Sequence, residues 1–232
     1  AYGTNTVKKV DKIVGPGSIY VTLAKKYLYG TVGIDGLYGP SEVVVLADSA
    51  PETLSLSPQL AADLIAQAEH GADSFVCFVS PSREICNAVL RQVEAQVERS
   101  SRGEILRESL ESSLMFCVET LEEAIELTNL AAPEHAEIWS HDALAIMPQI
   151  KHAGAVFLNT PVPLGDYIVG PSHTLPTGST ARFAQGVGVE TFLKRTSVIA
   201  ASQATMAALA EDLATLALLE DLPGHAAAGS GK

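Results

Sequence analysis

The sequence lacks long apolar runs and an excess of positive charge, and each shortage argues against a class of protein. No run of about 18 apolar residues is present to span a bilayer, and the first 30 residues lack the order of regions that marks a signal peptide. We therefore expect a cytoplasmic protein that does not enter a membrane. The 15 Lys plus Arg against 27 Asp plus Glu give a net charge of −12, which opposes docking on nucleic acid.

Cysteine is also scarce. Cys77, Cys86 and Cys117 are widely separated and form no Cys-x-x-Cys motif. Neither a disulfide framework nor a thiolate zinc site is therefore expected. Cys77 and Cys117 fall in apolar, strand-like runs, so we expect them to be small buried hydrophobic residues.

The chain of 232 residues, 47% of them hydrophobic, is long enough to bury one sizeable core. Short β-branched or apolar runs predict strands at 10–14, 43–47, 75–79, 114–118, 136–139 and 155–158. Between them, a 3.6-residue apolar period predicts helices at 18–29, 58–70, 81–98, 121–130 and 142–152. This alternation predicts an α/β fold, a mainly parallel sheet sandwiched by helices.

The pattern changes beyond residue 160. Residues 159–188 are rich in Gly, Pro, Ser and Thr, and loops of this length inside a compact chain are usually functional or disordered. Residues 201–219 predict a long Ala/Leu helix, and we expect disorder after His225. The C-terminal part is therefore expected to be a small helical tail.

One motif, Gln67-Ala68-Glu69-His70-Gly71, ends an amphipathic helix and sets an amide and an imidazole on one turn. Side chains three apart on a helix are neighbours, so Gln67 and His70 could hold one metal ion. Gly71 is a natural C-terminal cap, which would place His70 beside a loop that brings further ligands. The same pattern also fits a polar helix edge that ends in a histidine and has no function. This alternative stays open because the spacing alone is a weak signal.

Other histidines stand beside acids or in loops. His135 follows Pro133-Glu134, and Asp166 and His173 lie in the Gly/Pro-rich stretch, while His225 is in the tail. The two remaining histidines, His141 and His152, bracket an amphipathic segment and are expected at the surface.

Taken together, the ordered motifs resemble the histidinol dehydrogenase family. They are Gly15-Pro16-Gly17, Gly39-Pro40-Ser41-Glu42, Gln67-Ala68-Glu69-His70-Gly71, Pro133-Glu134-His135, Gly165-Asp166-Tyr167, His173-Thr174-Leu175-Pro176-Thr177, and Glu220 with His225. The resemblance runs over nearly the whole chain but covers only about the C-terminal half of such an enzyme. We therefore expect a fragment of a longer protein.

The resemblance implies oxidation of L-histidinol, a small amino alcohol, to L-histidine through the aldehyde, with zinc and NAD as cofactors. It places the zinc ligands on Gln67, His70, Asp166 and His225. It gives His135 the alcohol proton and Glu134 the activation of water. Residues implied to contact the substrate are Ser41, Gln67, His70, His135, Asp166, His173, Glu220 and His225.

The cofactor-binding site has the weakest sequence signal of the expected sites. No Gly-x-Gly-x-x-Gly fingerprint occurs. Gly15-Pro16-Gly17 precedes a predicted helix and could offer backbone amides to a phosphate, and Ser18 is the expected cofactor-binding residue. A plain strand-to-helix turn is at least as good an interpretation of this spacing. The family usually has Asn where this chain has Ser18.

The resemblance further implies three regions and a homodimer. Residues 1–36 would end a cofactor-binding domain, 37–175 would form the α/β metal- and substrate-binding domain, and 176–232 would form a loop and helical dimerisation tail exchanged between subunits. Gly36-Leu37-Tyr38 replaces a Met-Pro-Ala type of sequence, so a paralogue acting on another small polar alcohol is one alternative. A non-catalytic family member and a zinc hydrolase, with Glu134 activating water, are the others.

Overall fold

The structure, a computed structural model, describes residues 1–170 and 172–229, so Pro171 of the Gly170-Pro171-Ser172-His173 motif lies outside the described residues. The chain divides into two compact units, Ala1–Phe192 and Leu193–Lys232. Whether residues 1–36 bind a cofactor and residues 176–232 dimerise remains a prediction.

The first unit is built on a parallel sheet of five strands in the order β5-β4-β3-β6-β7. These strands are β3 (Glu42–Ala47), β4 (Phe75–Ser80), β5 (Leu114–Cys117), β6 (His135–Trp139) and β7 (Ala155–Leu158). The central strand β3 is almost continuously apolar because both faces of a parallel sheet are covered by helices. The predicted α/β fold with a mainly parallel sheet is confirmed.

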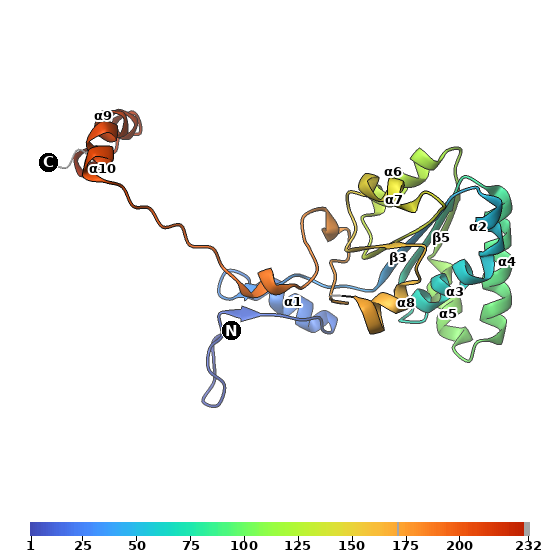
Figure 1. The fold of residues 1–232 in the computed structure, drawn as a ribbon. Helices are drawn as coiled ribbons and strands as arrows, with labels where there is room; N and C mark the ends of the chain where they lie inside the picture. The colour runs from blue at the N-terminus through green and yellow to red at the C-terminus, as the bar shows by residue number, and fades with distance from the viewer. Residues whose placement is uncertain (171, 230–232) are drawn as a thin grey trace. The chain divides into compact units, whose positions relative to one another are not determined.

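Helices cover both faces of the five-stranded sheet (Figure 1). Alternate residues of β3 face two separate cores: Val43, Val45 and Ala47 pack on one face with α3 and α4, whereas Val44 and Leu46 pack on the other with α6 and α7. The helices on the first face are α2 (Pro51–Ser55), α3 (Ser57–Ala68), α4 (Arg83–Arg99) and α5 (Gly103–Glu111). Those on the second are α6 (Leu121–Ala131), α7 (Ala143–Ile146) and the 3-10 helix η1 (Met147–Gln149).

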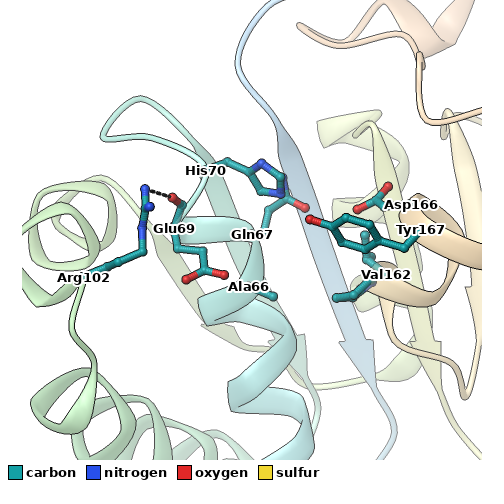
Figure 2. Close-up of a pocket in the computed structure, with 9 residues that line it drawn as sticks. Ala66, Gln67, Glu69, His70, Arg102, Val162, Asp166 and Tyr167 are labelled. Atoms are coloured by element: carbon teal, nitrogen blue, oxygen red, sulfur yellow. Dashed lines mark hydrogen bonds between the residues drawn. The ribbon is translucent and has the colours of Figure 1, made fainter.

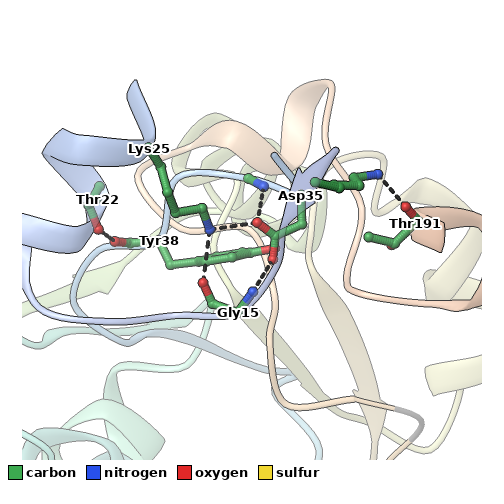
Figure 3. Close-up of polar contacts among 8 residues, drawn as sticks. Gly15, Thr22, Lys25, Asp35, Tyr38 and Thr191 are labelled. Carbon is green, nitrogen blue, oxygen red and sulfur yellow. Dashed lines mark hydrogen bonds and ion pairs between the residues drawn. The ribbon is translucent and has the colours of Figure 1, made fainter. Parts of the chain in front are cut away.

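A smaller parallel ribbon, β1 (Lys12–Ile13) with β2 (Gly33–Ile34), carries helix α1 (Ile19–Leu28) between its strands. Buried Lys25 of α1 bonds Asp35 Oδ1 at 2.5 Å and the Gly15 carbonyl at 2.8 Å, and the Gly15 amide donates to Asp35 Oδ2 at 2.6 Å (Figure 3). The ammonium of Lys25 also lies 4.8 Å from the centre of the Tyr38 ring. This network fixes the Gly15-Pro16-Gly17 turn.

Three local predictions are wrong. The predicted helix 142–152 ends at Ile146 and continues only as the short η1, which includes Pro148. Cys117 is exposed, because β5 is an edge strand, whereas Cys77 and Cys86 are buried. The predicted strand 10–14 forms only at Lys12–Ile13, outside the main sheet.

The Gly/Pro-rich stretch contains short ordered elements. They are α8 (Val162–Leu164), the π-helix η2 (Gly165–Val169), and the 3-10 helices η3 (Thr180–Arg182) and η4 (Val189–Phe192). π-Helical turns often occur at functional sites.

The second unit contains α9 (Gln203–Leu219) and α10 (Pro223–Gly229). Disorder is predicted after His225, but residues 226–229 are helical in α10, and residues 230–232 lie outside the described residues. Across the described residues, no helix has both the length and the apolarity needed to cross a membrane.

Candidate active site

The candidate site lies at the amino ends of the central strands. Ser41 immediately precedes β3, and Glu134 and His135 lie where β6 begins. Helix α3 runs back to the same end of the sheet, because it precedes the parallel strand β4, and so it delivers His70 there. In many open α/β sheets ligands bind instead at the carboxyl ends of the strands.

Two adjoining pockets collect most of the predicted residues. The first, of about 380 Å³, is lined by Gln67, His70 and Asp166 together with Arg102, Val162 and Tyr167 (Figure 2). The second, of about 460 Å³, is lined by Ser41, His70, Glu134, His135, Asp166 and His173, together with Pro16 and Tyr38. His70, Asp166 and Tyr167 border both pockets.

The C-terminal end of α3 presents the Gln67 and His70 pair. Gln67 is 2% exposed and its Nε2 has no hydrogen-bond partner among the described residues, whereas His70 is exposed at the pocket mouth. Arg102 donates from Nη2 to the Glu69 carbonyl at 2.8 Å and so holds the chain beside His70. Asp166 faces them from the π-helix η2 (Figure 2).

Glu134 is a buried acid with a raised pKa. Its side-chain Oε2 accepts from the Glu42 amide at 3.1 Å, and the Glu134 amide donates to Glu42 Oε2 at 3.3 Å. Burial, with smaller contributions from the negative charges of Glu42 and Asp166, raises the pKa of Glu134 to about 8. The side chain is therefore mostly a neutral acid at pH 7.

His135 lies between two acids without a hydrogen bond to either. Its Nδ1 is 3.8 Å from Glu134 Oε2 and its Nε2 is 3.7 Å from Asp166 Oδ1. The ring packs edge-on against Phe157 at 5.7 Å between centroids. Burial lowers the pKa of His135 to about 4, so the imidazole is neutral at pH 7 and can accept a proton.

Three predicted residues are not among those that line the two pockets. Ser18 is exposed and precedes the first turn of α1, beyond Pro16 of the second pocket. Glu220 and His225 line a separate pocket within the second unit. Their membership of the substrate and metal site remains a prediction.

Two buried acids beside the site were missed, Asp63 and Glu137. Asp63 lies one turn before Gln67 on α3, and Glu137 lies two residues after His135 on β6 and so on the same face. Their spacing was visible in the sequence, but an isolated acid in an apolar pattern does not reveal which acid it will meet across the fold.

The described part of the chain assembles no cluster of three or more His, Cys, Asp or Glu side chains for a metal, so the test of a metal site rests on the chemistry of the candidate donors. Gln67, His70 and Asp166 border one pocket, and the buried Gln67 amide lacks a partner. Amide, imidazole and carboxylate donors suit an open, catalytic type of zinc site.

The fold and site therefore define an α/β protein with a polar site at the amino ends of its central strands. Nitrogen and oxygen atoms of side chains line this site. Residues 1–231 match the family model for histidinol dehydrogenase. The histidinol dehydrogenase of Thermus thermophilus is 47% identical over 229 residues, which is 97% of this chain and 54% of that protein. That of Geobacillus kaustophilus is 44% identical over 231 residues, covering 98% of this chain and 54% of that protein.

Solved structures agree. A crystal structure of histidinol dehydrogenase from Elizabethkingia anophelis superposes with a TM-score of 0.91 at 36% identity, covering 98% of this chain and 52% of that chain. The chain belongs to the histidinol dehydrogenase family. It spans about half the length of the curated relatives it matches.

Proposed function

We propose that this chain carries the metal and substrate site of an enzyme that oxidises L-histidinol to L-histidine through the aldehyde. The observation that carries the proposal is the convergence of Gln67, His70 and Asp166 with Glu134 and His135 around two adjoining pockets. The names of its relatives support the substrate. We take zinc and NAD to be its cofactors.

Gln67, His70 and Asp166 would hold the zinc, with His225 as the fourth ligand. Bound zinc would supply a Lewis acid, with no redox change of its own. With a single carboxylate among otherwise neutral ligands, the zinc-loaded site would keep a net positive charge.

His135 is suited to take the proton of the alcohol. It is neutral at pH 7, both ring nitrogens are free of hydrogen bonds within the described residues, and it borders the second pocket. A positioned base of this kind typically contributes about 10²–10⁴-fold to a rate.

Glu134 is suited to the second stage, in which water adds to the aldehyde. Its raised pKa means that it must lose a proton before it can accept one from water. A cationic group beside it, such as the substrate ammonium, would lower that pKa and favour the carboxylate. His173 and Ser41 border the same pocket and would contact the substrate.

NAD would accept the hydride in each of the two oxidation stages. The turn Gly15-Pro16-Gly17, held by Asp35 and Lys25, would form one edge of its site, with Ser18 beside it. The Gly15 amide is already bonded to Asp35, and Pro16 has no N–H, so few backbone donors remain in this turn for a phosphate.

Product stoichiometry tests the proposal. The full enzyme that contains these residues should form two NADH per L-histidinol and one per histidinal. His135→Asn should slow the alcohol stage by about 10²-fold or more, and Glu134→Gln should slow the aldehyde stage more than the alcohol stage.

Absence of NADH from either substrate with zinc-loaded protein would refute the assignment. NAD-independent hydrolysis would instead support a zinc hydrolase, and equal losses in both stages for both variants would show that the two roles are not divided in this way.

A further inference from the structure

Asp63 and Glu137 are buried carboxyl groups that take no part in the chemistry proposed above. Asp63 is 2% exposed and Glu137 is fully buried. We call them the carboxyl pair, because burial and then the negative charge of Asp63 raise the pKa of Glu137, and the second effect requires the two carboxyl groups to be close together. A buried acid pair of this kind is costly unless its oxygens are all satisfied.

Both oxygens of Glu137 receive a donor from the protein. Trp139 Nε1 donates to Oε2 at 2.6 Å, and the Val162 amide donates to Oε1 at 3.1 Å. The Val162 amide belongs to the first turn of α8, where helix N–H groups have no partner within the helix. Glu137 on β6 therefore caps the α8–η2 segment that carries Asp166.

Asp63 completes the pair from α3. Gln59 Nε2 donates to its Oδ1 at 2.9 Å, while Oδ2 is buried and receives no N–H or hydroxyl donor from the described residues. Two neighbouring carboxylates in a buried site repel strongly, so we infer that one proton shared by the pair removes the repulsion and supplies the missing donor. Burial raises the pKa of Asp63 to about 6 and holds that of Glu137 well above its usual range.

The pair thus joins the three segments that carry the candidate metal ligands and the proposed base. Asp63 precedes Gln67 and His70 on α3, Glu137 follows His135 on β6, and Val162 leads to Asp166. Resting on the proposed function, we propose that the carboxyl pair is a positioning device that holds α3, β6 and α8–η2 in register for metal binding. Asp63 and Glu137 themselves line neither of the two pockets.

The variants Asp63→Asn and Asp63→Leu distinguish the polar link between Asp63 and Glu137 from the simple filling of buried volume. Asn keeps an oxygen for Gln59 and offers an amide N–H to Glu137, so the link survives without the shared proton. Leu fills a similar volume but breaks the link. Thr128→Val is the control, because Thr128 is fully buried, its hydroxyl donates to the Ala124 carbonyl of the same helix α6, and α6 covers the opposite face of the sheet.

Zinc affinity of the purified chain, measured by competition with a chromophoric chelator, is the first readout. Asp63→Leu should bind zinc roughly tenfold or more weakly, a loss typical of groups that orient metal ligands. Asp63→Asn and Thr128→Val should bind close to the wild-type value. Wild-type affinity in Asp63→Leu, or equal losses in Leu and Asn, would overturn the positioning role.

A second readout needs no metal. The chain has one tryptophan, so the indole N–H of Trp139 gives a single identifiable NMR resonance. Asp63→Leu removes the polar group beside Glu137, so this proton should shift, whereas in Asp63→Asn it should stay near its wild-type position. An unmoved resonance in Asp63→Leu would overturn the link between the two carboxyl groups. If the wild-type chain binds no zinc, the proposed metal site is wrong. The carboxyl pair can still be tested then, because the indole resonance and the hydrogen-exchange rate of the Val162 amide both report on Glu137.

Discussion

Glu42 and Glu134, 92 positions apart in the sequence, exchange hydrogen bonds in which the amide of each donates to the carboxylate of the other, at 3.1 and 3.3 Å. Glu42 Oε1 also accepts from the Gly178 amide at 2.8 Å. The arrangement ties the start of β3 to the start of β6 and holds the proposed water-activating acid beside His135.

Glu134 should make the stability of the first unit depend on pH. Its pKa is about 8 when folded and near 4.5 when unfolded, so its favourable contribution is full below about pH 4.5 and is lost as the pH rises through 8. In urea denaturation of the metal-free chain, Glu134→Gln should therefore raise the free energy of unfolding relative to wild type. This gain should be about 1–3 kcal/mol larger at pH 9 than at pH 5. The exposed Glu94→Gln is the control, and an equal pH slope in wild type and Glu134→Gln would contradict the raised pKa.

Gly154 should not tolerate a side chain. A Cβ there would lie 2.7 Å from the Glu134 carbonyl oxygen and 3.1 Å from Leu175 Cβ. Gly154→Ala should cost about 1–3 kcal/mol and displace Glu134, measured by denaturation and by the rate of aldehyde oxidation in the full enzyme. Gly103→Ala, whose Cβ would have no neighbour closer than 3.4 Å, should be nearly neutral, and a neutral Gly154→Ala would refute the close approach.

Lys25 should be needed to hold the turn at Gly15. Lys25→Met leaves Asp35 buried without its cation and should destabilise the first unit by about 3 kcal/mol, measured in guanidinium chloride. The adjacent Lys26 is exposed, so Lys26→Met is a matched control expected near zero. Similar values for the two variants would show that the Lys25–Asp35 pair contributes no more than a surface charge.

The sequence predicted the layers well because their signals are local. The strands at 43–47 and 75–79 are buried apolar runs between helices of clear period, and the structure has them at Glu42–Ala47 and Phe75–Ser80. The same locality fails for Cys117, whose exposure depends on β5 lying at the sheet edge.

The site was predicted only in part for the same reason. Gln67 and His70 share a helical turn, so their pairing is readable from spacing, whereas Asp166 meets them through the fold. Asp63 and Glu137 come from different elements and have no local pattern that announces their contact.

Exchange of the tail between subunits is tested by mixing chains. If His225 completes the partner's site, a mixed dimer of His70→Ala and His225→Ala chains has one site with both lesions and one with neither. Random pairing should then restore roughly a quarter of wild-type zinc retention, from two-fold symmetry alone. No recovery, after subunit exchange has been shown with labelled chains, would place His225 in its own subunit's site or outside the site.

Zinc content after dialysis tests the central assignment most directly. The wild-type chain and His141→Ala, whose side chain is 92% exposed, should each retain about one zinc per chain, because Gln67, His70 and Asp166 remain intact. His70→Ala should retain almost none. Retention of zinc by His70→Ala at the wild-type level would contradict the metal site.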